Sequence, residues 1–283
     1  MTTVAIISQK GGVGKTTIAV NLCYSLARRG WKVLVVDCDL QGGLGFSLTE
    51  RAKDAVGYYD FLAGLTDLTA SRIDSAIMET NQPGLSLMTR GSRQSLDELL
   101  SGMGQEWISE SRIHWIHDEL QAGDYDLIVY DTPAGIGPIG IGLCSVVDHL
   151  LVPERPEPLC LRSLPQVLRM IASVKANQDS DRPNLAGFVL SMADPDDPSN
   201  LDDQREFRDL LPNELVFETV IPEHRDFREA SRSGVPVALL RRRPSPSSLI
   251  FDQLAAEFEE RIQLFEETGL ESEEEEEHVR LVD

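Results

Sequence analysis

The sequence predicts a doubly wound α/β fold, with a mostly parallel sheet and helices on both faces. Short apolar runs alternate with helical patterns along the 283 residues, and this alternation is typical of parallel pairing. Runs such as 33–36 and 127–130 are apolar on both faces, which indicates a sheet covered on both sides. A glycine-rich loop follows one run and acidic residues end two others, at the strand ends where ligands of such sheets bind.

The elements follow in order along the chain. The first apolar run, 4–7, ends at glycines, and a helix from Thr16 to Arg29 follows and stops at Gly30. Further strands are expected at 32–37, 85–89, 126–131, 148–153, 185–192 and 215–221, and further helices at 107–122, 158–176, 201–211 and 246–267. The polar stretch 193–204 predicts a loop.

Composition indicates one acidic domain with a tail. The net charge is −21; eight glutamates and Asp283 against Arg280 give −8 within 266–283, which leaves −13 for the rest. We expect a single domain over 1–268 and an acidic, disordered tail over 269–283. An acidic body is repelled by nucleic acid, so any DNA contact requires a local basic patch.

The sequence favours a cytoplasmic protein. It has neither an apolar run of the roughly 18 residues that suggests a membrane span nor the pattern of a signal peptide at its start. The cysteines are far apart and lack metal-ligand spacing, so we expect buried, reduced thiols at Cys23, Cys38, Cys144 and Cys160.

The loop after the first strand has the chemistry of a phosphate site. Gly11, Gly12 and Gly14 let the backbone bend around an anion, and the following helix directs its positive end at the same place. Lys15 would neutralise the β- and γ-phosphates, and the Thr16 hydroxyl would bind Mg²⁺. The sequence therefore predicts a P-loop that binds a nucleotide with Mg²⁺.

A second lysine distinguishes this loop from the ordinary pattern. The loop reads KGGVGKTT over 10–17, with Gln9 where the ordinary pattern has a glycine. It resembles the deviant P-loop of the ParA/MinD family of ATPases, whose signature is the early lysine. The resemblance implies an ATP-bound homodimer in which Lys15 serves its own nucleotide and Lys10 the partner's. It implies nucleotide contacts from Lys10, Gly11, Gly12, Val13, Gly14, Lys15, Thr16 and Thr17.

Three aspartates follow the second and fourth predicted strands. Asp37 ends the run 32–37 and Asp39 lies just past it, while Asp131 ends the run 126–131 in the form of a Walker B strand. Asp131 would hold Mg²⁺, since that ion needs few protein ligands. The resemblance implies that Asp37 lies near the metal with Thr16 and Asp131, and that Asp39 positions the attacking water. The expected catalytic set is Lys10, Lys15 and Asp39.

The resemblance extends over most of the chain, except 50–110 and the tail. Residues 132–135 resemble the family's second switch, and the glycines that follow predict a mobile stretch. Residues 217–237 resemble a ParA segment with a basic helix, in which the loop around Pro222 lies against the adenine. Leu40 stands where the family pattern has proline, which leaves the first switch less restrained.

A basic patch follows this loop in an otherwise acidic chain. Between 224 and 243 there are six arginines against Asp226 and Glu229. Arginines pair with DNA phosphates, so we expect a DNA-docking surface, with a solvated helix face as the alternative. Its residues are Arg225, Arg228, Arg232, Arg241, Arg242 and Arg243.

The sequence therefore favours a ParA-type Mg²⁺-ATPase associated with the nucleoid. ATP would close a homodimer that binds DNA non-specifically, and a ParB-like or other partner would stimulate slow hydrolysis to position or segregate a cargo. The alternatives are a MinD-like membrane-cycling ATPase, which the glutamate run argues against, and a P-loop metabolic or cofactor-assembly enzyme. An iron–sulfur role for Cys144 is a weaker alternative.

Overall fold

The computed structural model describes residues 1–49, 55–64, 69–91, 109–157, 160–178 and 181–280. Its described strands form one sheet in the order β3-β4-β2-β5-β1-β6-β7-β8. All neighbours pair in parallel, except that β3 is antiparallel to β4. The strands are β1 (Thr2–Ile6), β2 (Val33–Asp37), β3 (Ile77–Glu79), β4 (Leu85–Met88), β5 (Leu127–Asp131), β6 (His149–Glu154), β7 (Asn184–Ala193) and β8 (Ile221–Pro222). The predicted doubly wound fold is confirmed.

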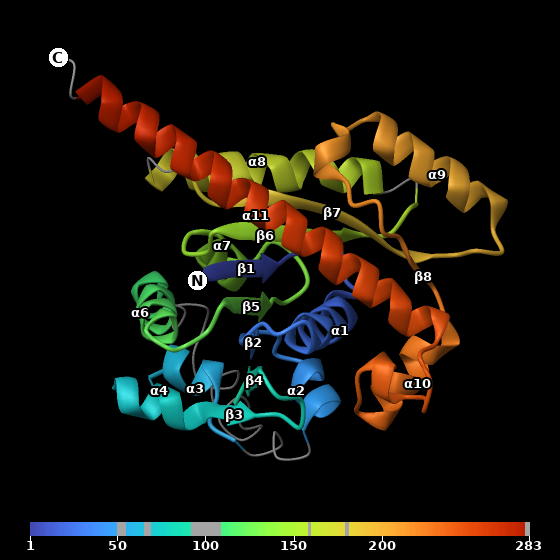
Figure 1. The fold of residues 1–283 in the computed structure, drawn as a ribbon, viewed down its shortest axis with the longest axis horizontal. Helices are drawn as coiled ribbons and strands as arrows, with labels where there is room; N and C mark the ends of the chain where they lie inside the picture. The colour runs from blue at the N-terminus through green and yellow to red at the C-terminus, as the bar shows by residue number, and fades with distance from the viewer. Residues whose placement is uncertain (50–54, 65–68, 92–108, 158–159, 179–180, 281–283) are drawn as a thin grey trace.

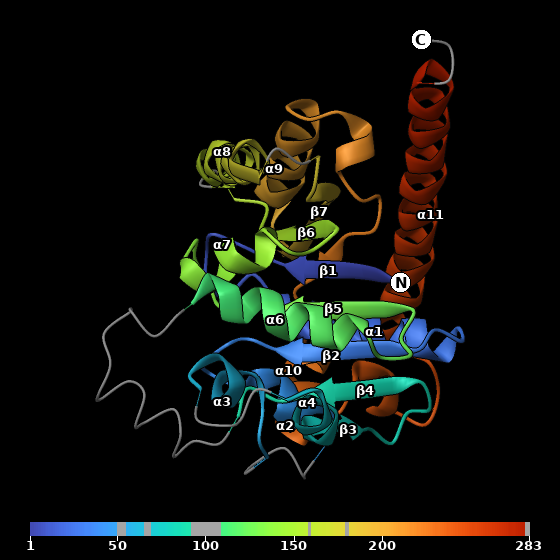
Figure 2. The same cartoon turned by 90° about the vertical axis from the view of Figure 1, so that its left-hand side faces the viewer.

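Helices cover both faces of this sheet (Figures 1 and 2). Alternate residues of β1 enter opposite cores: Val4 and Ile6 pack on one side, and Ala5 packs on the other. The first side is covered by α1 (Lys15–Arg28), α2 (Gly43–Leu48), α10 (Arg225–Ser233) and α11 (Pro246–Arg280). The second is covered by α3 (Tyr58–Leu62), α4 (Ala70–Ala76), α6 (Glu110–Gln121), α7 (Pro138–Cys144), α8 (Cys160–Gln178) and α9 (Pro198–Asp209).

The strand expected at 215–221 is mostly wrong. Residues 213–215 form a short 3₁₀ helix, η3 (Asn213–Leu215), Val216 makes an isolated parallel bridge to Phe188, and Ile221 and Pro222 pair as β8. The reason lies in α11: the Glu257 carboxylate accepts the backbone N–H groups of Glu218 at 2.7 Å and Thr219 at 3.0 Å. A side chain therefore takes the hydrogen bonds that a neighbouring strand would otherwise make.

One other expectation needs correction at a helix start. The polar loop expected at 193–204 ends early, because the Asp197 side chain accepts the Ser199 N–H at 2.9 Å and starts α9 at Pro198. The stretch after Gly135 forms α7, with Pro138 in its first turn, and its mobility stays a prediction. The short elements α2, α3, α4 and β3 are found only in the structure.

The C-terminal helix is longer than expected. It runs from Pro246 to Arg280, with its side chains described as far as Gln263. The domain boundary at 268 and the disorder of the tail after it stay predictions. Of the cysteines, Cys23, Cys38 and Cys144 are buried and free, as expected, and the Cys160 side chain lies outside the described part. Among the helices described, none is apolar enough over a sufficient length to cross a membrane.

Candidate nucleotide site and its switch loops

The glycine-rich loop lies between β1 and α1 at the carboxyl end of the sheet. Gly12 and Gly14 have φ of 77° and 84°, a conformation that side-chain-bearing residues rarely adopt. The Ser191 hydroxyl, at the end of β7, donates to the carbonyl of Val13 at 2.6 Å. The Gly14 carbonyl accepts from Ile18 N–H at 2.8 Å and begins α1. The sequence thus folds into the expected anion cradle at a helix N-terminus.

Lys15 is buried inside this cradle. Its ammonium donates to the hydroxyl of Ser8 at 2.9 Å. Burial lowers the pKa of Lys15, and the charges of Asp131 and Asp39 act in the opposite direction. A desolvated ammonium is favourable only beside negative charge, so this position suits a bound phosphate.

The Walker B carboxylate lies directly opposite the helix start. Asp131 is fully buried, and its Oδ2 accepts from the hydroxyl of Thr16 at 2.7 Å. Its Oδ1 is buried and has no hydrogen-bond partner in the described part of the chain. A buried carboxylate oxygen without a partner is costly, and a carboxylate with a hydroxyl is the oxygen ligand set that Mg²⁺ takes. The residues present therefore fit Mg²⁺.

Asp37 is the neighbour of Asp131 in the sheet register. Its carboxylate accepts the N–H of Asp39 at 3.2 Å and of Gly45 at 3.4 Å. Burial raises the pKa of Asp37 to about 7, and burial together with the Asp37 charge raises the pKa of Asp131 to about 8. Two buried carboxylates side by side repel each other unless a cation or protons separate them.

We expect Asp131→Asn to reduce the pH dependence of stability without metal. The pKa of Asp131 is about 8 when folded and about 4 when unfolded. The folded protein therefore binds more protons between these values, and the free energy of unfolding falls as pH rises through this window. In EDTA, Tm should fall less between pH 5 and pH 8 for Asp131→Asn than for wild type. The exposed control Asp124→Asn should follow wild type; an equal fall in Asp131→Asn would contradict the expectation.

The first switch loop follows β2. The Gly42 N–H donates to the carbonyl of Asp39 at 2.9 Å, which closes a four-residue turn. The Asp39 carboxylate accepts the N–H of Gln41 at 2.9 Å within that turn, and its charge acts on Lys15 and Asp131. Asp39 thus lies near the cradle, as its expected role requires.

The second switch loop follows β5. The Thr132 hydroxyl donates to the carbonyl of Ile6 at 2.8 Å, and the Gly135 N–H donates to the carbonyl of Ser8 at 2.9 Å. Gly135 has a φ of 90°, so the chain turns sharply before α7. These bonds place the loop against the first strand and the start of the glycine-rich loop.

The buried ammonium of Lys10 lacks a hydrogen-bond partner among the described residues. The Ser8 hydroxyl donates to the carbonyl of Lys10 at 2.7 Å, which fixes its backbone. A shielded cation without a partner is unfavourable, so an anion would stabilise it.

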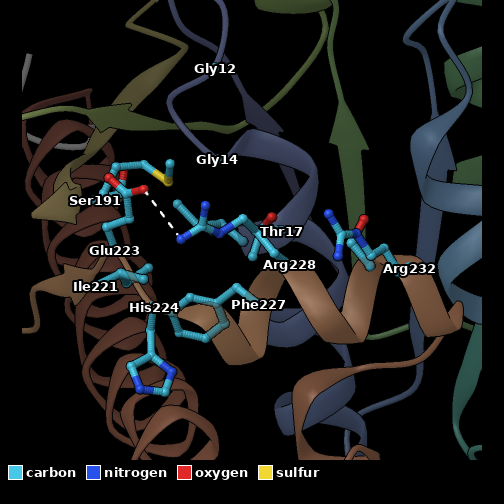
Figure 3. A pocket seen from close by; sticks show the side chains of 13 residues that line it. Gly12, Gly14, Thr17, Ser191, Ile221, Glu223, His224, Phe227, Arg228 and Arg232 are labelled. Carbon is cyan, nitrogen blue, oxygen red and sulfur yellow. Dashed lines mark ion pairs between the residues drawn. The ribbon is translucent and has the colours of Figure 1, made fainter.

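A cavity of about 430 Å³ opens beside the glycine-rich loop (Figure 3). Sequence reasoning expected Pro222 here; the cavity wall instead uses its neighbours Ile221 and Glu223. Met192 reaches the cavity with a φ of 56°, the only positive value outside glycine in the described chain. The lining is Gly12, Gly14, Thr17, Ile18, Ser191, Met192, Ile221, Glu223, His224, Phe227, Arg228, Ser231 and Arg232. Most of these residues carry no sequence signal beyond the resemblance over 217–237.

The six arginines do not form one surface. Arg228 and Arg232 line the cavity, and Arg228 pairs with Glu223 at 3.8 Å (Figure 3). Arg241 pairs with the buried carboxylate of Asp226 at 2.7 Å, and this bond lowers the pKa of Asp226. The remaining three, Arg225, Arg242 and Arg243, are exposed and make no ion pair in the described part of the chain.

This site and the sheet that holds it define a P-loop nucleotide-binding protein. A family profile described as an AAA domain matches residues 1–185. The chromosome partitioning protein ParA of Caulobacter vibrioides is 32% identical over 245 residues, covering 83% of this chain and 85% of that protein. The chromosome-partitioning ATPase Soj of Thermus thermophilus is 30% identical over 266 residues, covering 92% and 96%. The chain belongs to the ParA/MinD family of P-loop ATPases.

Solved structures agree on the fold. The cell division ATPase MinD of Pyrococcus furiosus superposes with a TM-score of 0.68 at 25% identity, over 92% of this chain and 98% of that one. An ATP complex of McdA from Cyanothece superposes with a TM-score of 0.74 over 93% and 96%; at 18% identity, this similarity supports the fold alone.

Proposed function

We propose that this protein is an ATP-dependent dimerising switch of ParA type that binds DNA non-specifically and positions or segregates a cargo. ATP with Mg²⁺ closes a homodimer, and hydrolysis opens it. Partition relatives at about 30% identity support this branch of the family. A ParB-like or other adaptor is the expected activator, and nucleoid DNA in the cytoplasm is the expected location.

Residues of this chain account for nucleotide and metal binding. Backbone N–H groups of the glycine-rich loop and the Lys15 ammonium would hold the phosphates. Thr16 and Asp131 would hold Mg²⁺, with Asp37 beside them. Bound Mg²⁺ would neutralise phosphate charge. The Asp39 carboxylate would orient the attacking water and accept its proton.

The main support for the proposal is that α10 both lines the cavity and begins the basic segment. One side of this helix lines the cavity beside the glycine-rich loop through Phe227, Arg228 and Arg232. Its first residue, Arg225, and two residues that follow the helix, Arg242 and Arg243, are exposed and make no ion pair within the described residues. A nucleotide in the cavity would therefore contact the helix that begins at Arg225 and that precedes Arg242 and Arg243 in the chain. We take Arg225, Arg242 and Arg243 as its principal DNA contacts, with Arg228, Arg232 and Arg241 in secondary roles.

The test is retention on DNA with a charge reversal, Arg242→Glu with Arg243→Glu. With ATP and Mg²⁺, wild type should bind DNA of unrelated sequences, and the double variant should lose this binding while keeping ATP affinity. Each lost phosphate contact lowers the slope of log K against log salt by about 0.9, so residual binding should depend less on salt.

The matched control reverses two exposed arginines elsewhere, Arg169→Glu with Arg205→Glu, for the same change in charge. Retention equal to wild type in the 242–243 variant, or equal loss in the control, would exclude this surface. Wild-type protein that binds ATP but no DNA, and turns over a second small substrate, would favour the metabolic alternative.

A further inference from the structure

The first switch loop is held at its backbone by side chains from outside the loop. The Tyr59 hydroxyl donates to the carbonyl of Cys38 at 2.7 Å. The Arg90 guanidinium donates through Nη1 to the carbonyl of Leu40. Both donors come from 57–91, the segment between the loop and α6. The loop is therefore fixed through two carbonyl oxygens, one on each side of Asp39.

The two donors are themselves joined into one support. The Tyr58 N–H donates to the carbonyl of Thr89 at 2.8 Å, and the Tyr59 N–H donates to the carbonyl of Arg90 at 2.9 Å. Tyr59 is fully buried, and Arg90 lies two residues beyond β4. The end of a sheet strand thus anchors both groups, so their positions depend on the core.

Arg90 also packs against the turn itself. Gly42 has a φ of 66°, and a methyl group added there would overlap the Arg90 side chain. Gly42 is the last residue of the turn that its N–H closes onto the carbonyl of Asp39. Arg90 therefore touches the turn at Leu40 and at Gly42, while the Asp39 carboxylate accepts the Gln41 N–H within the same turn.

We propose that Arg90 is a positioning residue for ATP hydrolysis. It holds the turn 39–42 so that the Asp39 carboxylate keeps its orientation toward the γ-phosphate side of the cradle. This inference rests on the proposed ATPase activity and on the proposed role of Asp39. A planar guanidinium suits the task because it donates in a fixed direction while its face packs on the glycine. Arg90 touches neither the nucleotide cavity nor the carboxylate that it positions.

The chain offers a matched control for this arrangement. The Arg112 guanidinium donates to the carbonyl of Leu62 at 2.8 Å. Gly64 has a φ of 73°, and a methyl group added there would overlap the Arg112 side chain, as one at Gly42 would overlap Arg90. Arg112 therefore makes the same kind of contact at the end of α3, the helix that carries Tyr59, but its guanidinium bonds the carbonyl of Leu62 and not the turn 39–42. Its loss should affect stability to a similar extent and leave hydrolysis unchanged.

The experiment measures basal ATP hydrolysis of Arg90→Ala, Arg90→Lys and Arg112→Ala, with Tm and the affinity for a non-hydrolysable ATP analogue. We expect kcat of Arg90→Ala to fall about tenfold, as for a displaced catalytic group, with analogue affinity within about twofold. Arg90→Lys should recover part of kcat because it keeps one donor. Arg112→Ala should keep wild-type kcat.

A second substitution in the Arg90→Ala variant tests whether its loss of kcat comes from the position of the turn 39–42 or from a general loss of structure. Leu40 is the second residue of the turn, the position that proline favours, and its N–H makes no hydrogen bond among the described residues. Leu40→Pro should therefore restrain the turn without Arg90. We expect it to raise kcat of Arg90→Ala several-fold, although Leu40 also packs against the core.

The outcomes are distinguishable. Wild-type kcat in Arg90→Ala, a loss of analogue affinity as large as the loss of kcat, or an equal loss of kcat in Arg112→Ala would each overturn the positioning role. Failure of Leu40→Pro to raise kcat in a variant that melts like Arg90→Ala would do the same. Wild-type protein without any ATP hydrolysis would instead contradict the proposed function.

Discussion

Lys10→Ala is expected to bind ATP with nearly wild-type affinity and to remain monomeric. Lys15, Thr16 and the glycine backbone supply the contacts to the chain's own nucleotide. Lys10 has the signature position of the family, and its ammonium makes no hydrogen bond among the residues described. In the dimer it would pair with the partner's triphosphate, and loss of one member of a buried charge pair costs about 2–5 kcal/mol. The dimer dissociation constant should therefore rise by at least about 30-fold.

Light scattering with a non-hydrolysable ATP analogue measures this directly. Lys32→Ala is the control, because Lys32 is exposed, lies just before β2, and pairs with Asp124. An analogue-dependent dimer of Lys10→Ala as tight as wild type would contradict the trans role. Loss of analogue binding in the same variant would show instead that Lys10 serves its own subunit's nucleotide.

Asp39→Ala is expected to abolish hydrolysis while preserving the ATP-bound dimer. A positioned general base contributes about 10²–10⁴ to rate, so kcat should fall by at least about 100-fold. Removing a carboxylate near the phosphates also removes repulsion, so ATP binding should not weaken. DNA retention should then persist for hours with ATP, where wild type releases DNA as it hydrolyses.

The measurement pairs phosphate release with the lifetime of the DNA complex. Asp39→Asn should behave like Asp39→Ala, because an amide keeps the size of the carboxylate and cannot accept the proton. Asp196→Ala, an exposed loop aspartate, is the control. Wild-type phosphate release from Asp39→Ala would show that the attacking water is oriented by another group.

The sheet could be predicted from the sequence because its strands are continuous apolar runs. Val33–Asp37 and Leu127–Asp131 are buried at every position, so the pattern signals a strand without reference to neighbours. The run 215–221 is apolar apart from Glu218 and Thr219, and Glu257, about 40 residues later, takes the N–H groups of these two residues. Local pattern contains no information about such a distant partner.

The phosphate and metal residues were predictable because their spacing is local. Gly14, Lys15 and Thr16 are adjacent in sequence, and Asp131 ends a strand that pairs with β1. The cavity wall was harder to predict from the sequence. Ser191, Met192 and Glu223 lie beside the glycine-rich loop because of the order of β6, β7 and β8 in the sheet, which the local sequence does not specify. The arginine patch looked uniform in sequence, whereas folding gives Arg228, Arg241 and Arg242 three different environments.

The contacts between α11 and the segment before β8 affect which positions can be substituted. Glu257 holds the peptide groups of Glu218 and Thr219 rather than their side chains, and Arg261 stacks at 4.1 Å over the ring of Phe217. Side-chain substitutions at 218 and 219 should therefore preserve these hydrogen bonds. The contacts require a carboxylate at 257 and a cation at 261, so we expect these two positions to tolerate few substitutions. The C-terminal helix would then vary less at these two positions than the segment 218–219 that it holds.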